Sequence, residues 1–313
     1  MSDLSDHFDG RRFFNPAVAA PPPLTALPRM LSSPRTKWPA WIDESPGAVP
    51  VRGSSAVVTF IGHATFLIQT EFGNILTDPM YSMRAGPWNL AGPRRVRAPG
   101  IPFDALPPIA IVLLSHNHYD HCDLKTLARI AKRHDPLVVT PLGNAPLLRS
   151  TGLRRVEELD WWQSATTTPM PVTMTPARHF SARGLHDRNR ALWGGFMIDA
   201  GGERIYFAGD SAYAPFFADI PRRLGAIDLA LLPIGAYEPR WFMSAVHMNP
   251  EDAVRAHLDL QSPPSIGMHF GTFQMAAEGI DQPLIDLAQA RDAHGVSESR
   301  FRAIDVGASV EVG

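Results

Sequence analysis

The feature that most constrains this chain is a cluster of four potential metal ligands on one short loop. The four are His116, His118, Asp120 and His121. They follow residues 109–114, an apolar and β-branched stretch of strand length, and precede a helical pattern that begins at Asp123. Imidazole nitrogens and carboxylate oxygens are the usual ligands of catalytic zinc. Because these side chains cannot all face one tetrahedral ion, the spacing predicts two ions served by one loop.

Three further candidate ligands stand at the ends of predicted strands. His179 follows residues 172–175, Asp210 follows residues 204–208, and His269 follows residues 265–268. A lone histidine after a strand is more often a core or surface residue. Together, however, these residues supply the ligands that the loop lacks, which a solvated loop that is merely rich in histidine would not explain. The sequence therefore predicts a metal centre assembled from both halves of the chain.

The order of these ligands resembles the pattern of the metallo-β-lactamase superfamily. More narrowly, the chain resembles the N-acyl-phosphatidylethanolamine-hydrolysing phospholipase D family over roughly residues 55–290. The stretches that carry this resemblance are 61–65, 76–79, 92–95, 115–121, 192–195, 207–210, 247 with 249–253, and 269–273. The resemblance implies an α/β fold, the four-layered αβ/βα sandwich, with a dinuclear metal site.

The resemblance also implies an assignment of the ligands. His116, His118 and His179 are expected to hold the first ion, Asp120, His121 and His269 the second, with Asp210 bridging them. Two zinc ions per chain are expected, although manganese or iron would also suit such ligands. The superfamily's β-lactamases lack a bridging aspartate here, so Asp210 favours hydrolysis of a phosphodiester, thioester or lactone.

Asp120 and His247 are the residues expected to act in catalysis. His247 lies just before a predicted helix, where the phospholipase family also has a histidine, and it is the expected proton donor to the leaving alkoxide. The alternative is that His247 only packs or caps. For His63 three interpretations stay open: support of a ligand, contact with substrate, or a buried turn residue.

Two segments of the chain resemble each other. Residues 66–78 and 196–210 each read as an apolar strand, a glycine turn, a second strand and a final aspartate. This similarity predicts two related halves about a pseudo-twofold axis, with the metals between them. Asp78 is then the counterpart of Asp210. We expect Asp78 to accept the second ring N–H of a ligand histidine, which fixes the tautomer of that ligand.

A loop at residues 79–100 is the expected border of the cleft. It contains Arg84, Arg94, Arg95 and Arg97 together with Trp88. Arg94 and Arg95 are the candidates for contact with a substrate phosphate or an anionic lipid surface. The alternative is a solvated loop whose arginines pair with nearby acids.

Length and composition agree with one catalytic domain at residues 55–313, preceded by a proline-rich arm at 1–54. Phe13, Phe14, Trp38 and Trp41 would be unusual in a free tail, so the arm is expected to pack on the body. The single cysteine, Cys122, allows no disulfide within the chain and is expected to be a small packing residue. The net charge of −2 gives no general attraction to nucleic acid.

The N-terminus has no apolar signal segment, and no stretch is long and apolar enough to span a membrane. We therefore expect the cytoplasm, with peripheral contact at the inner face of the membrane. The predicted activity is a phosphodiesterase of the phospholipase D type, acting on N-acyl-phosphatidylethanolamine-like phospholipids or a small phosphodiester. A lactonase or other small-ester hydrolase is the alternative, and a non-hydrolytic redox or metal-binding role is a third. The sequence indicates no oligomeric state.

Overall fold

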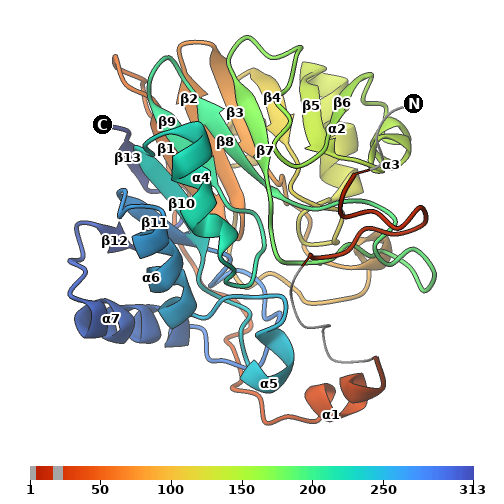
Figure 1. The fold of residues 1–313 in the computed structure, drawn as a ribbon, viewed down its shortest axis with the longest axis vertical. Coiled ribbons are helices and arrows are strands. Elements are labelled where there is room, and N and C mark those ends of the chain that lie inside the picture. The colour runs from red at the N-terminus through yellow and green to blue at the C-terminus, as the bar shows by residue number, and fades with distance from the viewer. Residues whose placement is uncertain (1–4, 17–23) are drawn as a thin grey trace.

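The computed structural model describes residues 5–16 and 24–313, in which two mixed β-sheets pack face to face with helices outside them (Figure 1). The first sheet has the order β13-β1-β2-β3-β4-β5-β6, and the second has the order β12-β11-β10-β9-β8-β7. The strands of the first are β1 (Val57–Gly62), β2 (Thr65–Thr70), β3 (Gly73–Thr77), β4 (Ile109–Leu113), β5 (Leu137–Pro141), β6 (Arg155–Leu159) and β13 (Ser309–Glu311). Those of the second are β7 (Val172–Thr175), β8 (Gly195–Asp199), β9 (Arg204–Phe207), β10 (Leu229–Pro233), β11 (Ser265–Met268) and β12 (Phe301–Arg302).

The two sheets repeat one pattern of strand pairing. In the first, β1, β2 and β3 are antiparallel neighbours, and β3, β4, β5 and β6 are parallel neighbours. In the second, β7, β8 and β9 are antiparallel and β9 through β12 are parallel. The predicted pair of related halves is therefore confirmed, with β13 added beside β1.

The helices lie outside the two sheets (Figure 1). They are α1 (Leu27–Leu31), α2 (Leu124–His134), α3 (Ala145–Arg149), α4 (Phe216–Leu224), α5 (Arg240–Met243), α6 (Pro250–Asp259) and α7 (Gln282–His294), with short 3₁₀ turns at Leu24–Ala26, Pro87–Asn89 and Phe103–Ala105. Some of them cover the outer sheet faces, whereas α1 and α5 lie beyond one end of the sheets (Figure 1). The expected capping residues start α2 and α6: the side chain of Asp123 accepts from the Lys125 N–H, and that of Asn249 from the Asp252 N–H. Gly295 ends α7 in the left-handed conformation.

Alternation along the strands divides the apolar side chains between two clusters. In β2, Phe66 and Ile68 face the large core between the sheets, whereas Leu67 packs under α2 with Leu127. Every residue of β1 and β2 is buried, as expected for strands that are covered on both faces. This double covering holds the strand ends, and therefore the loops that follow them, in fixed positions.

The described part of the N-terminal arm contacts the body, although residues 1–4 and 17–23, including the proline run at 21–23, lie outside the described residues. Phe13 and Trp38 are buried, and the indole N–H of Trp38 donates to the Glu278 carbonyl at 2.9 Å. The Asn15 side-chain amide donates to the carbonyl of His179 at 2.8 Å. The arm therefore reaches the backbone of a candidate metal ligand.

Candidate metal centre

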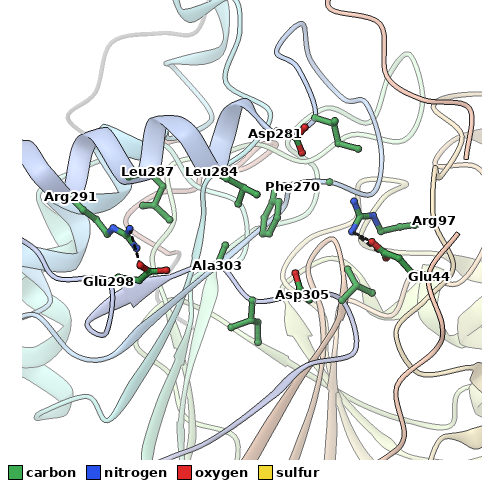
Figure 2. A pocket seen from close by; sticks show the side chains of 15 residues that line it. Glu44, Arg97, Phe270, Asp281, Leu284, Leu287, Arg291, Glu298, Ala303 and Asp305 are labelled. Atoms are coloured by element: carbon green, nitrogen blue, oxygen red, sulfur yellow. Dashed lines mark hydrogen bonds and ion pairs between the residues drawn. The ribbon is translucent and has the colours of Figure 1, made fainter. Parts of the chain in front are cut away.

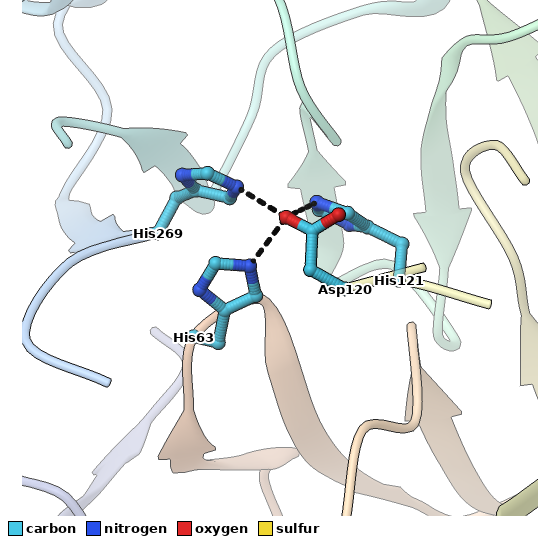
Figure 3. Close-up of side chains that lie close together, drawn as sticks. All are labelled: His63, Asp120, His121 and His269. Atoms are coloured by element: carbon cyan, nitrogen blue, oxygen red, sulfur yellow. Dashed lines mark hydrogen bonds and ion pairs between the residues drawn. The ribbon is translucent and has the colours of Figure 1, made fainter. Parts of the chain in front are cut away.

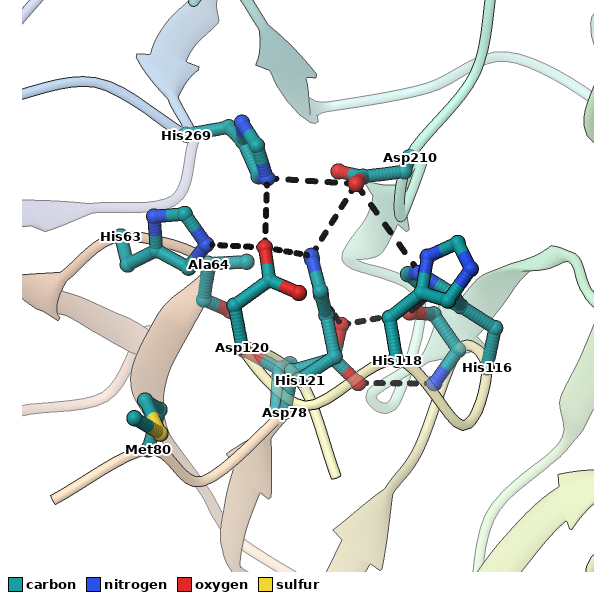
Figure 4. Close-up of polar contacts among 12 residues, drawn as sticks. His63, Ala64, Asp78, Met80, His116, His118, Asp120, His121, Asp210 and His269 are labelled. Carbon is teal, nitrogen blue, oxygen red and sulfur yellow. Dashed lines mark hydrogen bonds and ion pairs between the residues drawn. The ribbon is translucent and has the colours of Figure 1, made fainter. Parts of the chain in front are cut away.

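All the candidate ligands gather at one edge of the paired sheets. They follow β4, β7, β9 and β11, and the loops after β1 and β3 bring two more polar residues, His63 and Asp78, to the same edge. Strands β1, β3 and β4 run in the same direction, as do β7, β9 and β11, so their carboxyl ends meet. The expected assembly from both halves of the chain is what the fold produces (Figure 4).

His116, His118 and His179 form one cluster, called here the three-histidine group. The Nδ1 atom of His118 lies 2.8 Å from His116 Nε2 and 3.1 Å from His179 Nε2. His116 and His179 are almost fully buried, whereas His118 is half-buried. The centre is therefore most open on the side of His118.

Asp120, His121 and His269 form a second cluster, the mixed group, with His63 beside it (Figure 3). Asp120 Oδ2 lies 3.4 Å from the Nε2 atoms of both His121 and His269. Ligands at about 2.0–2.1 Å from one tetrahedral zinc ion stand about 3.3–3.4 Å from each other. The spacing of the mixed group therefore fits a shared ion.

The carboxylate of Asp210 lies between the two groups. Its Oδ2 atom is 3.1 Å from His121 Nε2 and 3.2 Å from His269 Nε2. The same oxygen is 3.9 Å from His116 Nε2 and 3.8 Å from His179 Nε2. This position is the one that a bridging ligand requires.

Asp78 lies beneath the centre and is fully buried. Its Oδ2 accepts from His121 Nδ1 at 2.7 Å and from the Ser115 hydroxyl at 2.5 Å, while its Oδ1 accepts from the Ser115 N–H at 2.7 Å. The Ser115 Oγ atom also lies 2.9 Å from His116 Nδ1 and can accept from it. Asp78 thus supports one histidine of the mixed group directly and one of the three-histidine group through a hydroxyl.

Burial leaves the three-histidine group uncharged. Desolvation lowers the pKa of His116 well below its usual value, the pKa of His118 to about 3 and the pKa of His179 to about 4. Neutral imidazoles offer a free lone pair to a metal ion without first losing a proton. In this respect the group is ready to bind a metal.

The mixed group has the opposite electrostatics. Burial alone would lower the pKa of His121 and His269, but the Asp210 carboxylate, aided by Asp120, raises the pKa of His121 well above its usual value and that of His269 to about 9. His121 Nε2 and His269 Nε2 have no hydrogen-bond partner despite their short separations from Asp210 Oδ2, and Asp210 Oδ1 has none either. Buried atoms that converge without hydrogen bonding, around an excess of negative charge, fit a divalent cation.

His247 faces the centre from the segment between α5 and α6. Its Nδ1 atom is buried without a hydrogen-bond partner and lies 4.0 Å from Asp210 Oδ2. The His179 ring is 5.0 Å away, and the Nδ1 atom of His179 is held by the Val246 carbonyl at 2.8 Å. The histidine that the sequence singled out is thus beside the candidate ligands.

The arginines of the 79–100 loop are placed differently from one another. Arg95 is buried and donates to the carbonyls of Ser82, Met80 and Arg97, which secures the loop's own fold. Arg97 pairs with Glu44 at 3.0 Å beside a cavity of about 540 Å³ against α7, whose lining includes none of the candidate ligands (Figure 2). Arg94 is exposed. Of the two arginines expected to contact substrate, only Arg94 keeps its side chain at the surface.

Two supports of the centre were not anticipated from the sequence. The hydroxyl of Ser115 links Asp78 to His116, and Asn15 holds the carbonyl of His179 across 164 positions of the chain. The sequence shows a serine directly before the run of candidate ligands, but it does not show where the hydroxyl of that serine points. No local signal in the arm points to the contact of Asn15.

Known proteins share this sequence and this fold. A model of the β-lactamase superfamily domain matches residues 73–270. An N-acyl-phosphatidylethanolamine-hydrolyzing phospholipase D of Caenorhabditis elegans is 36% identical over 267 residues, which span 81% of this chain and 75% of that protein. An uncharacterized protein of Mycobacterium tuberculosis is 39% identical over 258 residues, or 81% and 68% of the two chains.

Solved structures share the architecture at low sequence identity. An isothiocyanate hydrolase from Delia radicum gut bacteria superposes with a TM-score of 0.66 at 20% identity, covering 82% of this chain and 99% of that one. A metallo hydrolase of the archaeon Ignicoccus hospitalis gives 0.60 at 19% identity, covering 83% and 99%.

The chain therefore belongs to the metallo-β-lactamase superfamily, as a metal-dependent hydrolase with that superfamily's two-sheet fold. Within the superfamily, N-acyl-phosphatidylethanolamine-hydrolysing phospholipases D are among its relatives, as the sequence motifs predicted. Among the described residues, no helix is both long and apolar enough to cross a bilayer.

Proposed function

We propose that this protein is a dinuclear zinc phosphodiesterase of the phospholipase D type, acting on N-acyl-phosphatidylethanolamine-like phospholipids. The observation that carries the proposal is the 36% identity to the nematode phospholipase D, which extends over most of both chains. The position of Asp210 supports it, because one carboxylate oxygen lies near the imidazoles of both groups.

Two divalent ions in these groups would supply a water of lowered pKa and neutralise charge on the phosphoryl oxygens. The chain's own residues then have distinct tasks. Asp210 keeps the two groups together, and Asp120 presents Oδ2 to the mixed group. Asp78 holds the rings of His121 and, through Ser115, His116 in fixed orientations. Burial of these side chains excludes bulk water from the reacting centre.

In the proposed reaction, water adds to phosphorus and the bond from phosphorus to the N-acylethanolamine oxygen breaks. The leaving oxygen needs a proton, and His247 Nδ1 is the proposed donor. This atom has no hydrogen-bond partner and lies 4.0 Å from Asp210 Oδ2, beside the proposed metal centre where the leaving oxygen would be. The backbone carbonyl of His247 accepts from the Arg240 side chain at 3.0 Å, which fixes the segment that carries His247.

A groove of about 510 Å³ next to the metal loop is the proposed entrance for a lipid. Its lining includes Trp88, Tyr119 and Arg183, and the Tyr119 hydroxyl donates to the Arg183 carbonyl at 2.6 Å. The neighbouring loops expose large apolar side chains: Trp88 is 87% exposed and Leu185 is 95% exposed. Exposed apolar tips beside Arg84 and Arg94 suit peripheral contact with an anionic membrane surface.

Purified protein loaded with zinc tests the proposed substrate. Incubated with N-acyl-phosphatidylethanolamine, a γ-lactone and an acyl thioester, it should release N-acylethanolamine and phosphatidic acid from the first and leave the others largely intact. In water labelled with heavy oxygen, the label should enter the phosphate product, because the attack is on phosphorus. Faster turnover of the lactone would replace the phosphodiesterase proposal with the small-ester one.

Liposome binding tests the membrane contact separately. The double change Trp88→Ser and Leu185→Ser should weaken binding to anionic liposomes, while Arg94→Ser should reduce its salt dependence, since each arginine near such a surface contributes about 1 kcal/mol. Ile285→Ser, a change of an exposed residue on α7, is the matched control and should bind as the unchanged protein does. If the wild-type protein does not bind anionic liposomes at low salt, the proposed membrane contact is excluded.

A further inference from the structure

His63 lies in the turn between β1 and β2, and its ring is almost fully buried against the mixed group (Figure 3). The His63 Nε2 atom is 2.9 Å from Asp120 Oδ2. That separation is typical of an N–H···O hydrogen bond. It is shorter than the 3.4 Å from the same oxygen to His121 and His269. Because a carboxylate can only accept, His63 must carry its proton on Nε2 and donate it to Asp120.

The backbone of His63 holds a second ligand. Its carbonyl accepts from the His269 N–H at 2.7 Å, and its own N–H donates to the Thr272 hydroxyl at 3.0 Å. The rings of His63 and His269 pack at 4.1 Å, and the Phe273 ring meets His63 edge-on at 5.3 Å. His63, from a loop of the first sheet, thus holds the loop that follows β11 in the second sheet through two hydrogen bonds.

Both histidines have an unusual backbone conformation. His63 has a φ of 59° and His269 a φ of 63°, which lie in the left-handed region that is unfavourable for residues other than glycine. Such strain persists where the surroundings enforce it, and it gathers at functional sites. Here it aims two histidine side chains from facing turns at a single carboxylate, Asp120, while joining their backbones.

We propose that His63 is a positioning residue for the metal ion of the mixed group. Its ring N–H orients the Asp120 carboxylate, and its carbonyl fixes His269. Its contacts with the metal centre all involve the mixed group, namely Asp120, His121 and His269. The effect is therefore confined to one of the two ions. The inference rests on the metal centre and is independent of the substrate.

Zinc affinity, measured by competition with a chromophoric chelator, tests this proposal without relying on catalysis. His63→Asn removes the donor, since its amide is too short to reach Asp120, yet asparagine tolerates a positive φ. It should weaken the second zinc equivalent about 10–100-fold and leave the first unchanged. His63→Gln places an amide N–H near the original Nε2 position and should restore most of the affinity.

His257→Asn is the matched control. His257 is also a buried histidine with one hydrogen bond, to the Ser265 hydroxyl at 2.9 Å. It lies on α6, and its partner Ser265 begins β11, at the opposite end of that strand from the candidate ligand His269. Its substitution should leave both zinc equivalents bound as before. The cobalt-substituted protein should show altered visible bands in His63→Asn and unaltered ones in His257→Asn. An unchanged affinity for the second zinc equivalent in His63→Asn would overturn the proposal. The proposal would also fail if His63→Gln bound that equivalent as weakly as His63→Asn does, because this result would indicate that His63 is itself a metal ligand.

Discussion

Asp78 and Asp210 end equivalent hairpins in the two sheets, yet they have different surroundings. Asp78 directly follows β3, and its carboxylate accepts from two groups of Ser115 and from His121. Asp210 has one oxygen among the histidines of both groups and another with no hydrogen-bond partner. One aspartate supports ligands from below, whereas the other is placed as a ligand itself.

The difference arises from the residues between strand and aspartate. Asp78 comes one residue after β3 ends, whereas Ala208 and Gly209 separate Asp210 from the end of β9. Gly209 has a φ of 59°, and a Cβ atom there would lie 2.7 Å from the Cβ of Ser115. Only glycine permits this close approach and this backbone turn. A repeated hairpin therefore supplies a supporting carboxylate in one half and the proposed bridging carboxylate in the other.

Asp210→Asn should have the largest effect, because it removes the charge shared by both groups while keeping the shape. Metal content should fall from two equivalents towards one, and hydrolysis should fall by more than the roughly 100-fold that marks the upper range for residues outside the ligand set. Elemental analysis of protein purified without chelator, together with initial rates, measures both. Two firmly bound ions in this variant would remove the bridging role.

His247 Nδ1 lies 4.0 Å from Asp210 Oδ2, the oxygen of the proposed bridge. Its substitution tests proton donation to the leaving group, whereas the Asp210 variant tests metal binding. His247→Ala should retain both metals and lose about 10²–10⁴-fold in rate on alkyl phosphodiesters, whose leaving oxygen needs a proton. The loss should be much smaller on nitrophenyl esters, whose leaving group needs none. Equal losses on the two substrate types would make His247 a residue that positions substrate.

Asp78→Asn tests the supporting member of the pair. The substitution replaces one carboxylate oxygen with an amide NH₂, which cannot accept a hydrogen bond from His121 or Ser115. The three-histidine group and the mixed group should therefore both lose orientation. Metal affinity should fall about 10–100-fold, with both equivalents affected. Competition with a chelator measures the fall. If only one equivalent weakens, the link from Asp78 through Ser115 to His116 does not operate.

Ser115→Ala should have the smallest effect and should separate the two branches of that link. It removes the hydroxyl between Asp78 and His116 but leaves the direct bond to His121, and one lost hydrogen bond costs about 1 kcal/mol, roughly fivefold in affinity. The loss should fall on the equivalent held by the three-histidine group. An equal loss in both equivalents would contradict the separate branches.

Much of the fold was predictable because local patterns agree with it. The strand at 109–114, the helix caps at Asp123 and Asn249, and the end of α7 at Gly295 all appear where the sequence places them. The repeated hairpin gave the two related halves before any contact was known. These features depend on neighbours along the chain, so sequence pattern is sufficient to find them.

The direction of individual side chains was less predictable. Arg95 and Arg97 lie in the same loop as Arg94. Arg95, however, is buried and donates to the Met80 carbonyl, and Arg97 forms an ion pair with Glu44. Nothing in the run of arginines distinguishes them, because the groups that they meet come from elsewhere in the chain.

The sequence by itself determined the types of the candidate ligands, their order and the strand ends that carry them, since these follow from residue chemistry and periodicity. Only the tertiary structure decided that His63 donates to Asp120 and that Asn15 reaches His179, across 57 and 164 positions of the chain. Such contacts exist because two sheets pack at one relative orientation. That orientation is set by the whole buried core, and no local segment encodes it.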